Sequence, residues 1–192
     1  MKLRLTAALA ALSVGAVMAF GAVASGNGAS NPRHIVLVYN GPSVSNTHAA
    51  PNTAAFRSWC DSVCLPSVTM PAVDASTGSV EGRIYVWSKN ENLTGPLRFG
   101  EFAWFVLNDG DVYVDSGDNG TVGAIMPLSV KAPTHITGPG EVAAGGGDGT
   151  IVGGTGAYAH WTGTYTDRLF VELNLSGGPN YYDQLFWSIN PN

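Results

Sequence analysis

IVGGTGAYAHWTGTYTDRL, residues Ile151 to Leu169, places four glycines among threonine and aromatic residues, and the role of these glycines decides the fold. A dinucleotide-binding Gly-x-Gly-x-x-Gly loop that used Gly154 and Gly156 would need its third glycine at Ala159. A P-loop requires Gly-Lys-Ser/Thr, and no lysine follows Lys131. The residues after the glycines are β-branched and aromatic, which is typical of a strand and not of the helix that such loops open. The glycines are therefore predicted to form a bulge or tight corner, where backbone passes close to backbone.

The first 24 residues have the three parts of a secretory signal peptide. A basic start, Met1–Arg4, precedes an apolar run, Leu5–Phe20, and a small-x-small cleavage site ends at Ala24. The alternative is an uncleaved membrane anchor, because the apolar run approaches the length that spans a bilayer. The alanine and glycine content and the cleavage site favour removal of residues 1–24. We expect a secreted or periplasmic protein with no membrane attachment after cleavage, in which residues 25–33 form a linker.

Size and charge limit the kinds of partner. The 168 residues after the signal peptide suit a single domain with its own core, over residues 34–192. Without Lys2 and Arg4, seven basic residues face fourteen acidic ones, so the net charge is about −7. Such a chain has no basic surface for nucleic acid. With 12% charged and 45% hydrophobic residues it is expected to be globular and not disordered.

The chain has two cysteines, Cys60 and Cys64. In an oxidising compartment the simplest interpretation is one local disulfide. A C-x-x-x-C redox centre is the alternative. A zinc site is disfavoured because no histidine or second cysteine pair stands at the required spacing, and the sequence predicts no metal site.

Strand-like segments separated by turn signals occupy most of the domain. The first is His34–Tyr39, and it is followed by a proline-rich stretch, 43–75, which we interpret as a long irregular insertion. Within that insertion only Thr53–Ser62 could form a short helix, starting at Asn52 or Thr53. From Ser79 onward the pattern predicts an all-β fold, an eight-stranded closed antiparallel β-barrel of calycin-like form, wide enough for a small ligand. The later predicted strands are 80–88, 98–107, 111–115, 121–130, 158–175 and 181–190, with short segments at 134–137 and 141–144.

The glycine-rich segment also carries a family resemblance. Gly153-Gly154-Thr155-Gly156-Ala157-Tyr158, followed by Gly163, resembles the Gly-Gly-(Thr/Ser)-Gly-x-(Phe/Tyr) segment of allene oxide cyclases and dirigent proteins. The likeness covers roughly Ser79–Asn190 and is strongest from Gly147 onward; the 43–75 insertion has no counterpart. The resemblance implies an eight-stranded barrel with an apolar axial pocket, no metal or nucleotide cofactor, and assembly into dimers or trimers. Members of the family cyclise reactive intermediates or guide the stereochemistry of their coupling.

The predicted function follows from this resemblance and from the supply of aromatic residues. We expect a cofactor-independent cyclase or stereochemistry-guiding protein that acts on a small hydrophobic reactive intermediate. A non-catalytic carrier of a small hydrophobic ligand is the alternative, and a structural protein would be favoured if side chains filled the barrel. No Ser-His-Asp order or Gly-x-Ser-x-Gly elbow supports hydrolysis.

Glu101 is the leading candidate for acid–base chemistry. It shares a strand face with Ala103, Phe105 and Leu107, and a carboxyl on an apolar face is expected to have a raised pKa. The alternative is that this face points outward. Further predicted catalytic residues are Tyr85 and Tyr113, as hydrogen-bond donors across the lumen, and Arg83, as a partner for a carboxylate. The predicted ligand-binding residues are the aromatic side chains Trp87, Trp104, Phe105, Trp161, Tyr165 and Trp187. Arg168 and Glu172, four residues apart, are predicted to form a surface pair.

Overall fold

The chain folds into strands with very little helix. A computed structural model describes residues 34–92, 98–116, 120–127, 141–173 and 182–192. The predicted signal peptide and linker, and the short predicted segment 134–137, lie outside these residues. No helix within the described ranges is long and apolar enough to cross a bilayer. The elements are β1 (Ile35–Gly41), α1 (Ala54–Trp59), β2 (Cys64–Asp74), β3 (Val80–Asn92), β4 (Arg98–Leu107), β5 (Gly110–Asp115), β6 (Gly120–Pro127), β7 (Glu141–Gly154), a 3-10 turn η1 (Gly156–Tyr158), β8 (Gly163–Leu173) and β9 (Tyr182–Pro191).

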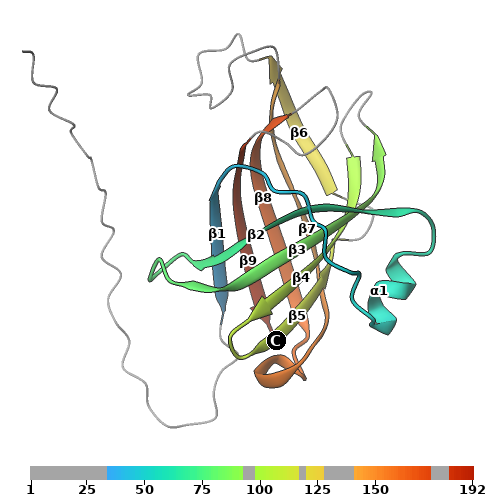
Figure 1. The fold of residues 1–192 in the computed structure, drawn as a ribbon, viewed down its shortest axis with the longest axis vertical. Helices are drawn as coiled ribbons and strands as arrows, with labels where there is room; N and C mark the ends of the chain where they lie inside the picture. The colour runs from blue at the N-terminus through green and yellow to red at the C-terminus, as the bar shows by residue number, and fades with distance from the viewer. Residues whose placement is uncertain (1–33, 93–97, 117–119, 128–140, 174–181) are drawn as a thin grey trace, which may run out of the picture.

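Antiparallel pairing closes these strands into the predicted eight-stranded barrel (Figure 1). Around the barrel the order is β1, β2, β3, β4, β5, β7, β8 and β9, and β9 pairs with β1 to close the sheet. Strand β6 pairs with Arg98 and Phe99 at the start of β4 and with residues 141–146 of β7. It therefore continues the line of β5, and the two strands together fill one of the eight positions.

The prediction that 43–75 is an irregular insertion is wrong for its second half. Strand β2 lies there and pairs with both β1 and β3, so it is part of the barrel wall. Its prolines hid the strand: Pro66 stands at a register shift that ends at Thr69, a position where a sheet tolerates proline. The inward alternation of Met70 and Ala72, both fully buried, is the strand signal in this stretch.

The predicted short helix is present and is fixed at both ends. The Thr53 hydroxyl accepts a hydrogen bond from the backbone N–H of Phe56 at 3.0 Å, which caps the N-terminus of α1. The predicted disulfide between Cys60 and Cys64 joins the end of α1 to the start of β2, with 5.7 Å between the two Cα atoms. The segment from Thr53 to Cys64 is thus tied to the barrel at a short distance.

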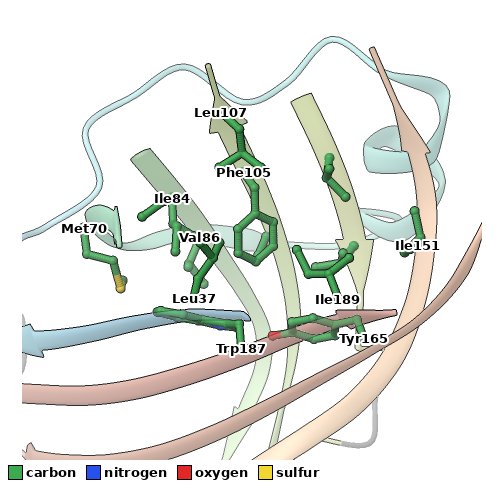
Figure 2. Packing of buried hydrophobic residues seen from close by; sticks show 14 residues of the cluster. Leu37, Met70, Ile84, Val86, Phe105, Leu107, Ile151, Tyr165, Trp187 and Ile189 are labelled. Carbon is green, nitrogen blue, oxygen red and sulfur yellow. The ribbon is translucent and has the colours of Figure 1, made fainter. Parts of the chain in front are cut away.

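The main core lies inside the barrel and follows the two-residue period of the strands. Ile84 and Val86 of β3, for example, face inward beside Ala103 and Phe105 of β4. Figure 2 shows side chains from different strands meeting around the ring of Phe105. The buried members of this core are Leu37, Met70, Ala72, Ile84, Val86, Ala103, Phe105, Leu107, Val112, Val114, Ile151, Tyr165, Trp187 and Ile189.

A second apolar cluster lies on the outer face of β3, β4 and β5. Helix α1 contributes Phe56 and Trp59, which pack on Phe102, with ring centroids 5.1 and 5.6 Å from it. Lys89 is 8% exposed and donates a hydrogen bond from Nζ to the backbone oxygen of Trp59 at 2.7 Å. The cluster holds the α1 segment against the outside of the barrel, and its buried members are Phe56, Trp59, Trp87, Phe102 and Tyr113.

The glycines between β7 and β8 form the predicted strand corner. Gly156 has a φ of +55°, and a Cβ atom there would lie 2.3 Å from the backbone oxygen of Asp109. At Gly163, where φ is +142°, a Cβ atom would lie 2.1 Å from the backbone oxygen of Asn190. Real Cβ atoms do not come so close to backbone, so these positions require glycine because one strand end passes against another.

Candidate functional site

Polar side chains gather at one level of the barrel interior. Glu101 of β4 faces Ser88 of β3 in register, and both lie on the inner face because Ala103 and Phe105 do. On the opposite wall, Tyr165 and Asp167 occupy successive inward positions of β8. The prediction that Glu101 shares the inward face of β4 with apolar residues is therefore confirmed, and the face does not point outward.

Glu101 is held by Tyr165. The Tyr165 hydroxyl donates a hydrogen bond to Oε1 of Glu101 at 2.8 Å. Burial raises the pKa of Glu101 from its ordinary value of 4.5 to about 7, and the hydrogen bond from Tyr165 opposes that rise. Burial, followed by the negative charge of Glu101, raises the pKa of Tyr165, so the phenol stays protonated and remains the donor.

Asp167 is a second carboxyl group at this level. It is 3% exposed, and its Oδ1 has no hydrogen-bond partner among the described residues. Burial, and next the negative charge of Glu101, raise the pKa of Asp167 well above its ordinary value. Arg168 opposes this rise, but its guanidinium also binds the exposed carboxylate of Asp148 at 3.3 Å. The two inward carboxyl groups thus interact with each other and disfavour each other's ionised form.

Aromatic rings form the apolar side of the site. Trp187 pairs in register with Asp167, and its ring lies 6.2 Å from that of Phe105. Figure 2 shows the Tyr165 hydroxyl directed toward Trp187. The indole N–H lowers the pKa of Tyr165, although it does not meet the geometry of a hydrogen bond. A ligand at Glu101 would therefore lie between polar oxygens and aromatic rings.

Strand β7 contributes almost no side-chain volume at this level. Gly147 is the register partner of Asp167, and Gly145 is the register partner of Leu169. Cross-strand partners lie on the same face of a sheet, so both glycines are on the inner face. The wall beside Asp167 is consequently bare backbone along β7.

Five predicted site residues lie on the outer face instead. Because Ile84 and Val86 point inward, their neighbours Arg83, Tyr85 and Trp87 point outward. By the same alternation Trp104 and Tyr113 point outward. Tyr113 is a buried member of the cluster under α1, and Trp104 packs against that cluster. The prediction that Tyr85 and Tyr113 donate hydrogen bonds across the lumen is therefore wrong, and so is the placement of Trp87 and Trp104 at an interior ligand site.

These outward residues have partners of their own. The Tyr113 hydroxyl donates a hydrogen bond to Oδ2 of Asp111 at 3.1 Å, and burial together with that carboxylate raises the pKa of Tyr113 to about 12. Arg83 is exposed and reaches Oγ1 of Thr69 at 3.5 Å. The Tyr85 ring is 4.3 Å from His48. Tyr113 and Tyr85 thus belong to or pack against the cluster on the outer face, and Arg83, Tyr85 and Tyr113 make these contacts away from Glu101.

Four predicted ligand-binding aromatic residues are associated with the inner core. Phe105, Tyr165 and Trp187 are fully buried in the barrel, and the Phe105 ring lies 6.4 Å from the ring of Tyr165 and 6.2 Å from that of Trp187. Trp161 is half-buried and packs against the same core beside Tyr158, with ring centroids 4.7 Å apart. Their burial is equally that of ordinary core residues, so their contact with a ligand stays a prediction.

Sequence reasoning missed Asp167, although the signal was present. Asp167 alternates with Tyr165, Leu169 and Val171, so it is an acid on an apolar strand face, as Glu101 is. The sequence prediction instead paired the neighbouring Arg168 with Glu172 on the surface. Arg168 binds Asp148, and Glu172 is 1% exposed, so that surface pair is wrong.

Within the described residues, no three histidine, cysteine, aspartate or glutamate side chains lie together as potential metal ligands. No protein family, curated protein or solved structure matches this chain.

Proposed function

We propose that the barrel interior at Glu101 carries out proton transfer, without a cofactor, on a small hydrophobic molecule. The reaction class is that of a cyclase or isomerase, or of a protein that guides the stereochemistry of a coupling. One observation carries the proposal: on the inner face of the barrel, next to the apolar core, Glu101 has a pKa raised to about 7 and accepts a hydrogen bond from Tyr165. Such a group is partly ionised near neutral pH, so it can both accept and donate a proton.

The surroundings of Glu101 support this chemistry. Tyr165 fixes one carboxyl oxygen, which orients the group, and the rings of Phe105 and Trp187 limit the conformations that an apolar substrate could take. Each 1.36 kcal/mol between competing transition states changes a product ratio about tenfold, so shape alone can select one product. The resemblance of Gly153–Gly163 to allene oxide cyclases and dirigent proteins favours cyclisation. The resemblance also favours assembly into dimers or trimers, and the signal-peptide pattern of residues 1–24 favours secretion or periplasmic location.

A non-catalytic carrier is the second candidate. It is favoured by the apolar character of the rest of the interior, where fourteen buried residues form one cluster. A carrier needs that apolar contact but no ionisable group. The two candidates therefore differ in what happens when the Glu101 carboxyl is removed.

The test uses a neutral hydrophobic probe and a model reaction. Binding of N-phenyl-1-naphthylamine is followed by its fluorescence, and turnover is followed by ultraviolet absorbance with cyclic β,γ-unsaturated ketones, which conjugate when a proton moves. We expect Glu101→Gln to lose about 100-fold or more in turnover while probe affinity stays within about threefold. Glu81→Gln is the matched control, because Glu81 makes a surface hydrogen bond to Asn108.

The outcomes separate the candidates. Probe binding without turnover of any ketone by the wild-type protein supports the carrier. Equal turnover by wild type and Glu101→Gln contradicts the acid–base role of Glu101. Absence of both binding and turnover contradicts an interior ligand site of either kind.

A further inference from the structure

Asp167 has no structural explanation in the fold. A buried carboxyl group with an unpartnered oxygen is costly, because burial removes its water without a replacement hydrogen bond. The Oδ1 atom of Asp167 is in this condition on the inner face of β8, beside the bare backbone at Gly147. Nothing in the packing requires an acid here, since Leu169 and Val171 occupy the next inward positions of the same strand. A hydrogen-bonding ligand would satisfy this oxygen.

We propose that Asp167 is the second catalytic residue of this site: its protonated carboxyl donates a hydrogen bond to the carbonyl oxygen of an unsaturated ketone while Glu101 removes a proton from the adjacent carbon. This assignment rests on the function proposed above and specifies its substrate class. The site then has two catalytic carboxyl groups: Asp167 donates a hydrogen bond, and Glu101 accepts a proton.

The division of roles follows from the surroundings of each acid. Two carboxyl groups that interact in an apolar interior do not both ionise readily, so near neutral pH the pair retains a proton. Glu101 accepts a hydrogen bond from Tyr165, which stabilises its ionised form. Asp167 lacks such a donor at Oδ1. The proton therefore stays on Asp167, and Glu101 is the base.

The remaining charged groups near the pair do not change this division. Arg168 is the cation whose charge lowers the pKa of Asp167, and its guanidinium donates to the backbone oxygens of Gly147 and Asp167 and to Asp148. Asp148 adds negative charge and favours the protonated form of Asp167. Ser88 of β3 and Ser116, which follows β5 and accepts a hydrogen bond from the Glu101 backbone N–H, are neutral.

The step balances without any further reactant. The Glu101 carboxylate takes a proton from the carbon next to the carbonyl, and the electrons of that C–H bond form a C=C bond to the carbonyl carbon. The C=O electrons move to the oxygen, which Asp167 stabilises by its hydrogen bond. Glu101 then returns its proton to the far end of the conjugated system while the C=O bond reforms. The net change is the movement of one hydrogen and one double bond.

The same geometry indicates which ligands are disfavoured. A carboxylate ligand would add a negative charge beside Glu101, and the apolar rings of Phe105 and Trp187 offer it no cation. A neutral ketone brings one acceptor oxygen to the carboxyl group of Asp167, whose Oδ1 has no partner among the described residues. Its hydrocarbon part would contact the aromatic rings.

The experiment uses 2-naphthol, a planar phenol that mimics an enol, and follows its fluorescence on binding at about pH 8. We expect Asp167→Ala to weaken binding about tenfold or more, and Asp167→Asn, which keeps a donor of the same size, to stay within about threefold of wild type. Asp111→Asn, the same change on the outer face, should have no effect. Infrared spectroscopy at the same pH should show a protonated carboxyl that disappears in Asp167→Asn and persists in Glu101→Gln.

Two results would overturn the inference. One is wild-type affinity for 2-naphthol in Asp167→Ala, and the other is a protonated carboxyl that is lost from Glu101→Gln but kept in Asp167→Asn. Failure of the underlying function looks different: the wild-type protein would then bind neither 2-naphthol nor N-phenyl-1-naphthylamine. Thermal unfolding of Asp167→Asn shows whether the variant is folded before either measurement is interpreted.

Discussion

Substitution of Glu101 by glutamine should change how the stability of the protein depends on pH. Burial raises the pKa of Glu101 from 4.5 to about 7, so the folded state binds a proton in a pH range where the unfolded chain has lost it. Below about pH 4.5 both states are protonated, and Glu101 contributes no pH dependence. Between about pH 4.5 and 7 the contribution of Glu101 lowers the free energy of unfolding as pH rises. Above pH 7 Glu101 is ionised in both states and causes no further decrease.

The magnitude follows from the size of the shift. About 2.5 pH units at 1.36 kcal/mol per unit correspond to about 3 kcal/mol of stability lost from Glu101 alone. Glutamine has the same shape as glutamate and does not titrate. The free energy of unfolding of Glu101→Gln minus that of wild type should therefore be about 3 kcal/mol larger at pH 8 than at pH 4.5. Asp167 adds a loss of the same sign, which the double variant Glu101→Gln/Asp167→Asn should remove.

Urea denaturation followed by tryptophan fluorescence at several pH values gives this quantity. Taking the difference between variant and wild type removes the contribution of acids that do not interact with Glu101. A difference that is independent of pH would refute the burial of Glu101. A wild-type protein that gains stability relative to Glu101→Gln as pH rises would mean that its carboxylate is stabilised in the ionised form, which contradicts the site described here.

Three further predictions concern the fold, each measured as a change in the free energy of unfolding. Gly156→Ala should cost about 1–3 kcal/mol more than Gly78→Ala, because both have positive φ but only Gly156 lies against backbone; equal costs would contradict the close approach at Asp109. Phe102→Ala should cost about 3–5 kcal/mol, against less than about 1 kcal/mol for Phe186→Ala, which is 43% exposed; similar losses would mean that the outer cluster is not packed. Replacing both Cys60 and Cys64 by serine should cost about 2 kcal/mol, and reduction of wild type should match it; no effect of reduction would show that the disulfide does not form.

The barrel could be predicted because its strands carry strong local signals. Asn108-Asp109-Gly110 joins β4 to β5 as expected, and the alternation of apolar residues along β4 placed Glu101 on the inner face correctly. The glycines between β7 and β8 indicated a corner, because glycine is needed where strands approach closely.

The failures arose where the sequence could not say which face is the inside. Tyr85, Trp87 and Trp104 form apolar strand faces, and such a face predicts burial without specifying what buries it. Here Phe56 of helix α1 packs on Trp87 from outside, and His48 packs on Tyr85 and Trp104, so burial depends on contacts between segments far apart in the chain. Strand β2 was missed because its prolines outweighed the alternation of Met70 and Ala72. Asp167 was not predicted, because the four-residue spacing of Arg168 and Glu172 suggested an ion pair and the alternation of Asp167 with apolar residues was not used.

The pairing of β1 sets the order in which the barrel can form during synthesis. Strand β1 has seven register pairs with β9 and two with β2, and Nε2 of His34 lies 2.8 Å from Oγ of Ser188, 154 residues later in the chain. Strand β1 is synthesised long before its main partner, β9. Until β9 is available, the edge of β1 that will face β9 is open to pairing with another chain. Closure becomes a late event that the nascent chain cannot complete before translation reaches β9. A cell that makes this protein must keep β1 from pairing elsewhere for that interval.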